Sequence, residues 1–415
     1  MNRKLTRRSV TAGLALGALA SPGLGIGIAR AQAKAVKIAM IAPLSGPWAR
    51  QGQLLRMGSD MAVDDINSQG GIKALGGAKI EIIYADAGDS TEKAKNAAQR
   101  LLSDHPDLVG GSGAWLSSFT LAVTEVTERA QLPWLTLSYS DAITNRGFKF
   151  VFQTSPTAEW QAAETLPTAI KLAEAATGKR PKTIGIIQDN TASPVSFGKQ
   201  LREGGGLDKA GLKPVVDQVF TPPLSDATPL IDKVRSARPD FLLLLLSAMP
   251  DNKLVLEKLD EFKLSKGRIP VVGNGSPLGA PEMLKLIGAE LLEGLIFSVA
   301  DWGLKGQEDI IERFTKRTGE PWITQDSITG YGDMWIFKEA LERAGVADKL
   351  KVAEAIRGLN LTEGIAAACF PGPIHFDEKG RRQDVPMIFA QWQNGVPVTV
   401  YPTARALAKP FWPSS

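Results

Sequence analysis

Short apolar segments alternate with longer amphipathic segments along most of this chain. The apolar segments have the length of β-strands; they are 36–41, 80–84, 108–110, 134–137, 183–188, 214–220, 241–247, 270–273 and 294–299. The segments between them have the apolar spacing of helices; they are 51–69, 90–104, 118–130, 160–178, 196–210, 228–237 and 251–264. This alternation predicts an α/β protein in which doubly wound parallel sheets are covered by helices on both faces.

The alternation occurs twice, over about 36–150 and over 183–280, which predicts two similar lobes. Even without its first 33 residues, the chain has about 380 residues, more than a single hydrophobic core usually contains. Phe241–Leu246 is an unbroken apolar run. It predicts a central strand buried on both faces, and it is far too short to cross a bilayer.

The first 33 residues resemble a cleaved export signal, with basic residues first, a mild apolar stretch and the small-residue site Ala29-Arg30-Ala31. Thr6–Val10 (TRRSV) resembles a twin-arginine motif, and a general secretory signal that contains two arginines is the alternative. Thr11, Ser21, Pro22 and several glycines interrupt the apolar stretch, and no cysteine follows it for lipid attachment. We therefore expect a soluble mature protein in the periplasm, without membrane insertion.

Removal of this signal changes the charge balance. The signal contains five basic and no acidic residues, so the formal charge of +4 becomes about −1. The pI of about 8.9 therefore does not indicate nucleic-acid binding. One cysteine, Cys369, cannot form an internal disulfide, and we expect it to be buried. The chain has only two histidines, His105 and His375, which are too few to favour a histidine-containing metal site or a catalytic Ser–His pair.

Polar and aromatic clusters follow several predicted strands, at the ends where open α/β sheets bind ligands. The clusters are 43–48, 111–118, 138–140, 189–191 and 247–251. Ser117 and Ser118 begin a predicted helix, where they could either cap it or hold an anion. Four tryptophans near strand ends or connectors predict core packing or, taken together, an apolar ligand pocket; they are Trp48, Trp115, Trp160 and Trp302.

Cofactor motifs are weak. Gly111-Ser112-Gly113 lacks the third glycine of a dinucleotide-binding loop, and no phosphate-binding lysine loop occurs. Asp86-Ala87-Gly88-Asp89 offers too few ligands for a cation and is more typical of a solvated turn. We expect no cofactor and no metal.

Four segments resemble the periplasmic leucine/isoleucine/valine-binding proteins: Ile41–Pro47 with Gly52 and Gly58, Asp65–Ile72, Gly372–Gly380 and Gln391–Gly395. The resemblance extends in order over essentially the whole mature chain. It implies a type I periplasmic-binding-protein fold, with two α/β lobes joined by three crossovers and a ligand in the cleft. The lobes are then expected at 34–153 with about 300–362, and at 154–299 with about 363–415.

The resemblance also implies ligand-binding residues. Ser117 matches a serine that holds the ligand carboxylate, and Ser140 matches a threonine with the same role. Phe197 falls where the family has an aromatic residue, and Asp251 falls where a glutamate pairs with the ligand ammonium. Asp251 is one methylene shorter than that glutamate and Phe197 has no hydroxyl, and both differences disfavour an α-amino acid ligand. The candidate ligand-binding set is Trp48, Trp115, Ser117, Ser118, Ser138, Ser140, Trp160, Phe197, Asp251 and Trp302.

These observations predict a monomeric, non-enzymatic receptor that delivers a small carboxylate to the membrane permease of an ABC importer. The ligand is expected to be a branched-chain or other apolar amino acid, or an aromatic carboxylate. A ligand sensor for a chemoreceptor or kinase is the alternative, because the same closed surface would serve both. An exported hydrolase would need a nucleophile–base pair, which two isolated histidines do not provide.

Overall fold

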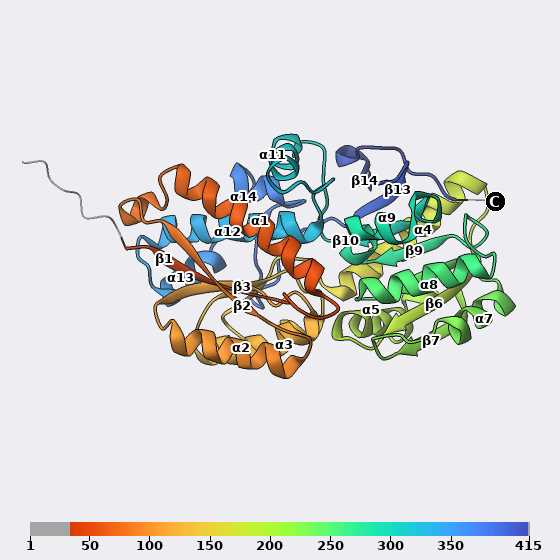
Figure 1. Ribbon diagram of the computed structural model, residues 1–415, viewed down its shortest axis with the longest axis horizontal. Helices are drawn as coiled ribbons and strands as arrows, with labels where there is room; N and C mark the ends of the chain where they lie inside the picture. The colour runs from red at the N-terminus through yellow and green to blue at the C-terminus, as the bar shows by residue number, and fades with distance from the viewer. Residues whose placement is uncertain (1–33, 414–415) are drawn as a thin grey trace, which may run out of the picture. The chain divides into compact units, whose positions relative to one another are not determined.

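The computed structural model describes residues 34–413 (Figure 1). The predicted export signal lies outside the described residues. Strand β1 begins at Val36, and the following elements alternate between strand and helix as far as β10, which ends at Val299. The mixed α/β class with parallel sheets is therefore confirmed.

The first sheet has five parallel strands in the order β2-β1-β3-β4-β5. They are β1 (Val36–Ala42), β2 (Ile80–Asp86), β3 (Leu108–Gly113), β4 (Trp134–Thr136) and β5 (Val151–Gln153). Its helices are α1 (Ala49–Ser68), α2 (Thr91–Asp104), α3 (Ser117–Arg129), α12 (Gln325–Ala344) and α13 (Lys349–Arg357). Figure 1 shows α2 and α3 on one face of this sheet and α1 and α12 on the other. We call this sheet and its helices the first lobe.

The second sheet has seven strands in the order β14-β13-β10-β9-β8-β6-β7. They are β6 (Thr183–Asp189), β7 (Lys213–Phe220), β8 (Phe241–Leu245), β9 (Val271–Asn274), β10 (Ile296–Val299), β13 (Ile388–Gln393) and β14 (Val396–Tyr401). Its helices are α4 (Ala158–Thr177), α5 (Ala192–Arg202), α6 (Gly206–Ala210), α7 (Thr228–Ala237), α8 (Met249–Glu261), α9 (Pro281–Ile287) and α10 (Ala289–Leu292). We call this sheet and its helices the second lobe.

Strand β8 occupies an interior position of the second sheet, between β6 and β9, and all five of its residues are buried. The prediction of a central strand in this apolar run is confirmed. At one end of this sheet, β13 pairs antiparallel with both β10 and the edge strand β14. Of the strands in the two large sheets, three lie outside the predicted strand segments: β13, β14 and the short β5 of the first sheet. The single helix expected over 196–210 is wrong, because α5 and α6 are separated at 203–205, where Gly205 has φ +72°.

The chain passes three times between the sheets: after β5, after β10, and over the segment that precedes β13. That last segment contains α14 (Gly364–Cys369) and the two-stranded sheet of β11 (Asn360–Leu361) and β12 (Ile374–His375), while α11 (Glu308–Thr318) follows the second passage. The first and third passages pair, because Gln153 N donates to Gly380 O and Arg382 N donates to Gln153 O. The predicted lobe boundaries stay a proposal.

Three apolar clusters hold these layers together: one lies in the first lobe and two lie in the second, on opposite faces of its sheet. Cys369 is fully buried in the first cluster, as predicted, and burial raises the pKa of its thiol.

Candidate functional site

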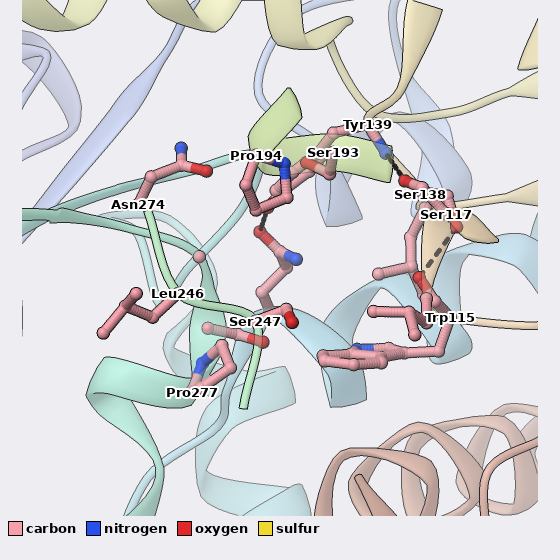
Figure 2. A pocket seen from close by; sticks show the side chains of 15 residues that line it. Trp115, Ser117, Ser138, Tyr139, Ser193, Pro194, Leu246, Ser247, Asn274 and Pro277 are labelled. Atoms are coloured by element: carbon pink, nitrogen blue, oxygen red, sulfur yellow. Dashed lines mark hydrogen bonds between the residues drawn. The ribbon is translucent and has the colours of Figure 1, made fainter. Parts of the chain in front are cut away.

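A cavity lies where the carboxyl ends of parallel strands from both sheets meet (Figure 2). Its walls come from residues at or just after the ends of β3, β4, β6, β8 and β9, together with Gln325 at the start of α12. They are Trp115, Leu116, Ser117, Leu137, Ser138, Tyr139, Ser193, Pro194, Leu246, Ser247, Asn274, Gly275, Ser276, Pro277 and Gln325. The volume is ≈ 50 Å³, on a measure in which one water needs about 10–15 Å³. The cavity therefore has room only for a small molecule.

The loop between β3 and α3 reaches the cavity in a strained conformation. Gly113, Ala114 and Trp115 all have positive φ, at 105°, 63° and 52°. A non-glycine residue in this region costs about 1–3 kcal/mol and persists only where its surroundings hold it. Here Leu116 N donates to Ala114 O at 2.7 Å, and the Trp115 indole Nε1 donates to Asp326 Oδ1 at 2.7 Å. The strain places Trp115 against the cavity.

Ser117 follows this loop, and its hydroxyl is fixed by the backbone of the next strand end. Its Oγ accepts hydrogen bonds from Tyr139 N and Ser140 N, both at 3.1 Å. Within the described chain no side chain caps α3, whose N-cap residue is Leu116, so the interpretation of Ser117 as a helix cap does not hold. With both lone pairs occupied, the Ser117 hydroxyl is left as a donor.

Tyr139 and Gln325 meet at the cavity from different elements. The Tyr139 hydroxyl donates to Gln325 Oε1, and Ala300 N donates to the same oxygen at 2.8 Å. Burial raises the pKa of Tyr139 above its ordinary value, so the phenol stays protonated and acts as a donor. The Gln325 oxygen is therefore saturated, and its Nε2 amide donates to no residue within 34–413.

In the second lobe, one carboxylate fixes two strand ends. Asp189, at the end of β6, accepts from the backbone N and hydroxyl of Thr191, at 2.8 and 2.6 Å, and from those of Ser247, at 2.6 and 2.7 Å. Four donors fill the lone pairs of this buried carboxylate. Ser247 and the β8 end are thereby held beside β6.

Asp326 lies behind the cavity wall at the start of α12. Its Oδ1 accepts from Trp115 Nε1 of the first lobe and from Ser276 Oγ of the second lobe, the latter at 2.9 Å. Burial raises the pKa of Asp326 to about 6. This carboxylate joins loops from both lobes at one oxygen.

Besides the Ala300–Gln325 bond, several interactions among residues 34–413 cross between the lobes. They include Ala192 N to Ser118 Oγ (3.2 Å), Ser140 Oγ with Ser196 Oγ (2.8 Å), Ser276 Oγ to Asp326 Oδ1 (2.9 Å) and Arg50 Nε to Glu282 Oε2 (2.8 Å). A molecule in the cavity would touch both lobes while these contacts hold them together.

Of the ten residues predicted from the sequence, Trp115, Ser117 and Ser138 line the cavity. Figure 2 shows these three on one side and Leu246, Asn274 and Pro277 on the other. The Ser138 hydroxyl donates to Trp115 O at 2.7 Å and contacts Thr120 Oγ1 at 2.6 Å, so it supports the loop. Ser118 and Ser140 do not line the cavity, but their hydroxyls form hydrogen bonds with the second lobe.

The remaining predicted residues lie elsewhere. Trp48 packs edge-on against Phe119 at 5.4 Å, Phe197 is fully buried in the second lobe, and Trp302 packs against Phe297 with its Nε1 bonded to Pro397 O. Trp160 is 47% exposed and lines a separate surface hollow near Arg381. Asp251 is buried in α8, and its Oδ1 accepts from Leu224 N at 2.9 Å.

Sequence reasoning missed most of the second-lobe wall. Asn274–Pro277 directly follows the predicted strand 270–273, so the strand-end rule that located Ser117 could have found it. Tyr139 and Ser247 lie in the predicted strand-end clusters 138–140 and 247–251 but outside the predicted ligand-binding set. Gln325 had no local signal, because it begins a helix in a distant part of the chain.

Among residues 34–413, no group of three or more His, Cys, Asp or Glu side chains is arranged to hold a metal ion. In the same range, no helix combines the length and the hydropathy needed to cross a bilayer.

Comparison with known proteins places the chain among binding proteins. The family model described as "Periplasmic binding protein" matches residues 35–396. Leu/Ile/Val-binding protein homolog 8 of Brucella melitensis is 27% identical over 386 residues, which cover 90% of this chain and 92% of the relative. A leucine binding protein from Thermotoga maritima has a TM-score of 0.73 at 22% identity, covering 88% of this chain and 97% of that one. A solute binding protein from R. palustris, in complex with benzoate, has a TM-score of 0.74 at 15% identity, covering 90% and 98%.

Proposed function

The chain belongs to the periplasmic binding protein family, and from this premise we propose that it is the extracytoplasmic solute-binding receptor of an ABC importer. The observation that carries the proposal is the cavity itself. Strand ends from both sheets and Gln325 of α12 line it, and hydrogen bonds and an ion pair join the two lobes. A ligand held there contacts both lobes and stabilises their closed arrangement, because it gains contacts that the open arrangement lacks.

The lining supports binding rather than catalysis. It contains several serines, but none of its residues, all within 34–413, is a histidine, a cysteine or a charged residue. A serine nucleophile needs a neighbouring general base, and neither histidine lines the cavity.

We propose that the ligand is a small carboxylate with an apolar body: a branched-chain or other apolar amino acid, or an aromatic carboxylate. The Ser117 hydroxyl and Gln325 Nε2 supply donors for the carboxylate, and Trp115, Leu137 and Pro194 supply apolar wall. The names of the comparison proteins, which refer to leucine in one structure and benzoate in another, support the same range.

Delivery of the ligand completes the proposal. The closed protein, a monomer, would dock on a membrane permease through surfaces of both lobes, so that the permease distinguishes the loaded from the empty receptor. A sensor would use the same surface, and co-purification of the ligand-bound protein with either a permease or a receptor kinase separates the two roles. Residues 1–33 would direct the chain to the periplasm. Replacement of Arg7 and Arg8 by lysine distinguishes the two export routes, because it blocks twin-arginine export and leaves general secretory export intact.

A thermal-shift screen of the exported protein tests the proposed function. The panel contains apolar amino acids, their amides and aromatic carboxylates. A ligand at 100 times its Kd adds about 2.7 kcal/mol to the free energy of unfolding, which raises the melting temperature by several degrees. If no carboxylate in the panel raises it, the proposed function is wrong.

A further inference from the structure

The end of β9 brings the side-chain amide of Asn274 to the cavity wall, where only 9% of the residue is exposed. Its Nδ2 donates to Gln161 Oε1 of α4 at 2.6 Å and to Ser298 Oγ of β10 at 3.1 Å. Gln161 and Ser298 are both fully buried. The two protons of Asn274 Nδ2 are therefore used inside the second lobe.

These two partners fix which end of the Asn274 amide faces the cavity. Gln161 Nε2 donates to Pro156 O at 3.1 Å, so Gln161 Oε1 is the atom that meets Asn274. The Ser298 hydroxyl donates its proton to Gly273 O at 3.4 Å. A flipped Asn274 amide would place its oxygen against two other oxygens with no proton between them, which is costly in a buried position.

Asn274 Oδ1 is therefore an acceptor of fixed direction at the cavity wall. Figure 2 shows this oxygen turned to the cavity and the nitrogen turned away from it, and no donor among residues 34–413 bonds it. Ser247 and Ser276 also line the cavity, and they have donated their hydroxyl protons to Asp189 and Asp326. Their oxygens can offer a ligand only lone pairs, so three side-chain acceptors of the second lobe lie at the wall.

The proposed carboxylate site lies across the cavity from this acceptor. The Ser117 hydroxyl and Gln325 Nε2 belong to the first lobe, and Figure 2 shows Ser117 and Asn274 on opposite sides. A ligand whose carboxylate is bound by the first lobe can therefore also donate to Asn274 Oδ1 of the second lobe. This second bond forms only while the lobes are closed, so it favours the closed arrangement.

The fixed acceptor distinguishes between ligands. A ligand that covers Asn274 Oδ1 with an apolar group removes water from the oxygen and provides no hydrogen bond in exchange, which lowers affinity. A ligand that places an N–H or O–H group there replaces the lost bond. An amino group and a hydroxyl group both satisfy this requirement.

We propose that Asn274 determines the specificity of this cavity, and that the ligand carries, besides its carboxylate, an amino or hydroxyl group that donates to Asn274 Oδ1. This inference rests on the proposed function. Within that function it selects amino- or hydroxy-substituted carboxylates over unsubstituted ones. It also assigns the acceptor of a ligand amino group to Asn274 rather than to Asp251, which does not line the cavity.

Calorimetric titration of the exported mature protein with two matched series tests the ligand class. The first series is leucine, 2-hydroxy-4-methylpentanoate and 4-methylpentanoate, and the second is 4-aminobenzoate, 4-hydroxybenzoate and benzoate. In at least one series, a substituted compound should bind more tightly than the unsubstituted acid by about tenfold or more, and the tighter of the two identifies the donor as amino or hydroxyl. A smaller gain in every series that binds overturns the inference and leaves the proposed function standing. Absence of binding by all six compounds overturns the proposed function as well.

Asn274→Leu tests the residue, because it removes the acceptor with little change of side-chain size. It should weaken the substituted compound by about tenfold or more and the unsubstituted acid by less than about threefold. Thr165→Val is the matched control: Thr165 Oγ1 donates to Ser298 Oγ at 3.2 Å in the same network and does not line the cavity. It should weaken both compounds by less than about threefold. Equal losses of the two compounds in Asn274→Leu would overturn the inference.

Gln161→Leu tests the fixed direction of the amide and serves if Asn274→Leu does not fold. It leaves Asn274 at the wall and frees its amide to turn. The ratio of the two affinities, substituted over unsubstituted, should fall by about threefold or more, a change that a general loss of stability would not produce. An unchanged ratio in a folded Gln161→Leu protein overturns the assignment. Titration of the tighter compound in the presence of the weaker one measures an affinity that is too low for direct titration.

Discussion

The Ser276 hydroxyl donates a hydrogen bond of 2.9 Å to Oδ1 of Asp326, and this bond runs from the β9 end of the second lobe to helix α12 of the first. Asp326 is 1% exposed, and the same oxygen accepts from Trp115 at the opposite wall. The bond therefore joins the two lobes directly beside the cavity.

Removal of this bond is predicted to weaken ligand binding by favouring separation of the lobes. A hydrogen bond to a charged group contributes about 1.5–3 kcal/mol, and a neutral one about 0.5–1.5 kcal/mol. Ser276→Ala should therefore lower the affinity about tenfold or more, while Ser196→Ala, which removes the neutral Ser140–Ser196 contact, should lower it about threefold. Calorimetry measures both affinities, and X-ray scattering of the ligand-free Ser276→Ala protein should show a larger radius of gyration. Equal effects of the two substitutions would contradict the role of Asp326.

Ser117 is predicted to act on ligand affinity more than a helix-capping serine does. Ser117→Ala removes the donor at the cavity and unpairs Tyr139 N and Ser140 N. Ser90→Ala is the control, because the Ser90 side chain caps α2 by accepting from Lys93 N and does not line the cavity. Both variants should lose stability, about 1 kcal/mol for a lost cap. Only Ser117→Ala should lose affinity, by about tenfold or more, consistent with a charge-assisted bond. Unchanged affinity in Ser117→Ala would remove it from the site.

The buried Asp333 predicts a pH dependence of stability. Its Oδ2 accepts from Ser112 Oγ at 2.5 Å, and burial raises its pKa from 3.8 to about 7. Between about pH 4 and pH 7 the folded protein therefore binds more protons than the unfolded chain, so the free energy of unfolding falls as pH rises. Asp333→Asn keeps an acceptor without the titration. This variant should lose less of its free energy of unfolding as pH rises. It should be more stable than the wild type at pH 8 by about 2–4 kcal/mol, since one pKa unit corresponds to about 1.4 kcal/mol.

Chemical denaturation of wild type and variant at pH 4.5, 6 and 8 measures this slope. Asp89→Asn is the control, because Asp89 is at the surface and its pKa is lowered by the hydrogen bond and ion pair with Lys93. In that variant the free energy of unfolding should decrease between pH 4.5 and pH 8 by as much as in the wild type. A variant Asp333→Asn that is less stable than wild type at pH 8 would show that burial of the charge is not the dominant effect there.

Close contact of α1 with α12 predicts a strong effect at Gly58. A Cβ at this position would lie 1.8 Å from the backbone oxygen of Ser327, whereas a Cβ at Gly358 would have no neighbour nearer than 3.6 Å. Overpacking against a rigid backbone costs about 1–3 kcal/mol or more. Gly58→Ala should therefore lower the melting temperature by many degrees and Gly358→Ala by little. A wild-type melting temperature for Gly58→Ala would contradict the helix spacing.

Much of the architecture could be predicted because it rests on local patterns. The apolar runs predicted the strands of the two large sheets except β5, β13 and β14. The rule that ligands bind at the carboxyl ends of strands selected Trp115, Ser117 and Ser138. The break between α5 and α6 was not recognised, although Gly204 and Gly205 lie at it.

The direction of a side chain and the approach of distant segments could not be predicted in the same way. Trp302 follows a strand as expected, yet its ring turns into the core and bonds Pro397 O. Trp160 is held at the surface by Val385 O. Gln325 reaches the cavity because α12 packs against α1, from which it is separated by some 270 residues of sequence. No local sequence pattern predicts a contact between such distant segments.

A crystal structure of the protein with the tightest-binding compound of the screen tests the central claim most directly. The account predicts electron density for one ligand in the cavity between the lobes. Its carboxylate should lie within hydrogen-bond distance of Ser117 Oγ and Gln325 Nε2, and its apolar body should pack against Trp115. Density for the ligand in another hollow, or a carboxylate turned away from Ser117 with an ammonium group bound at Asp251, would contradict it.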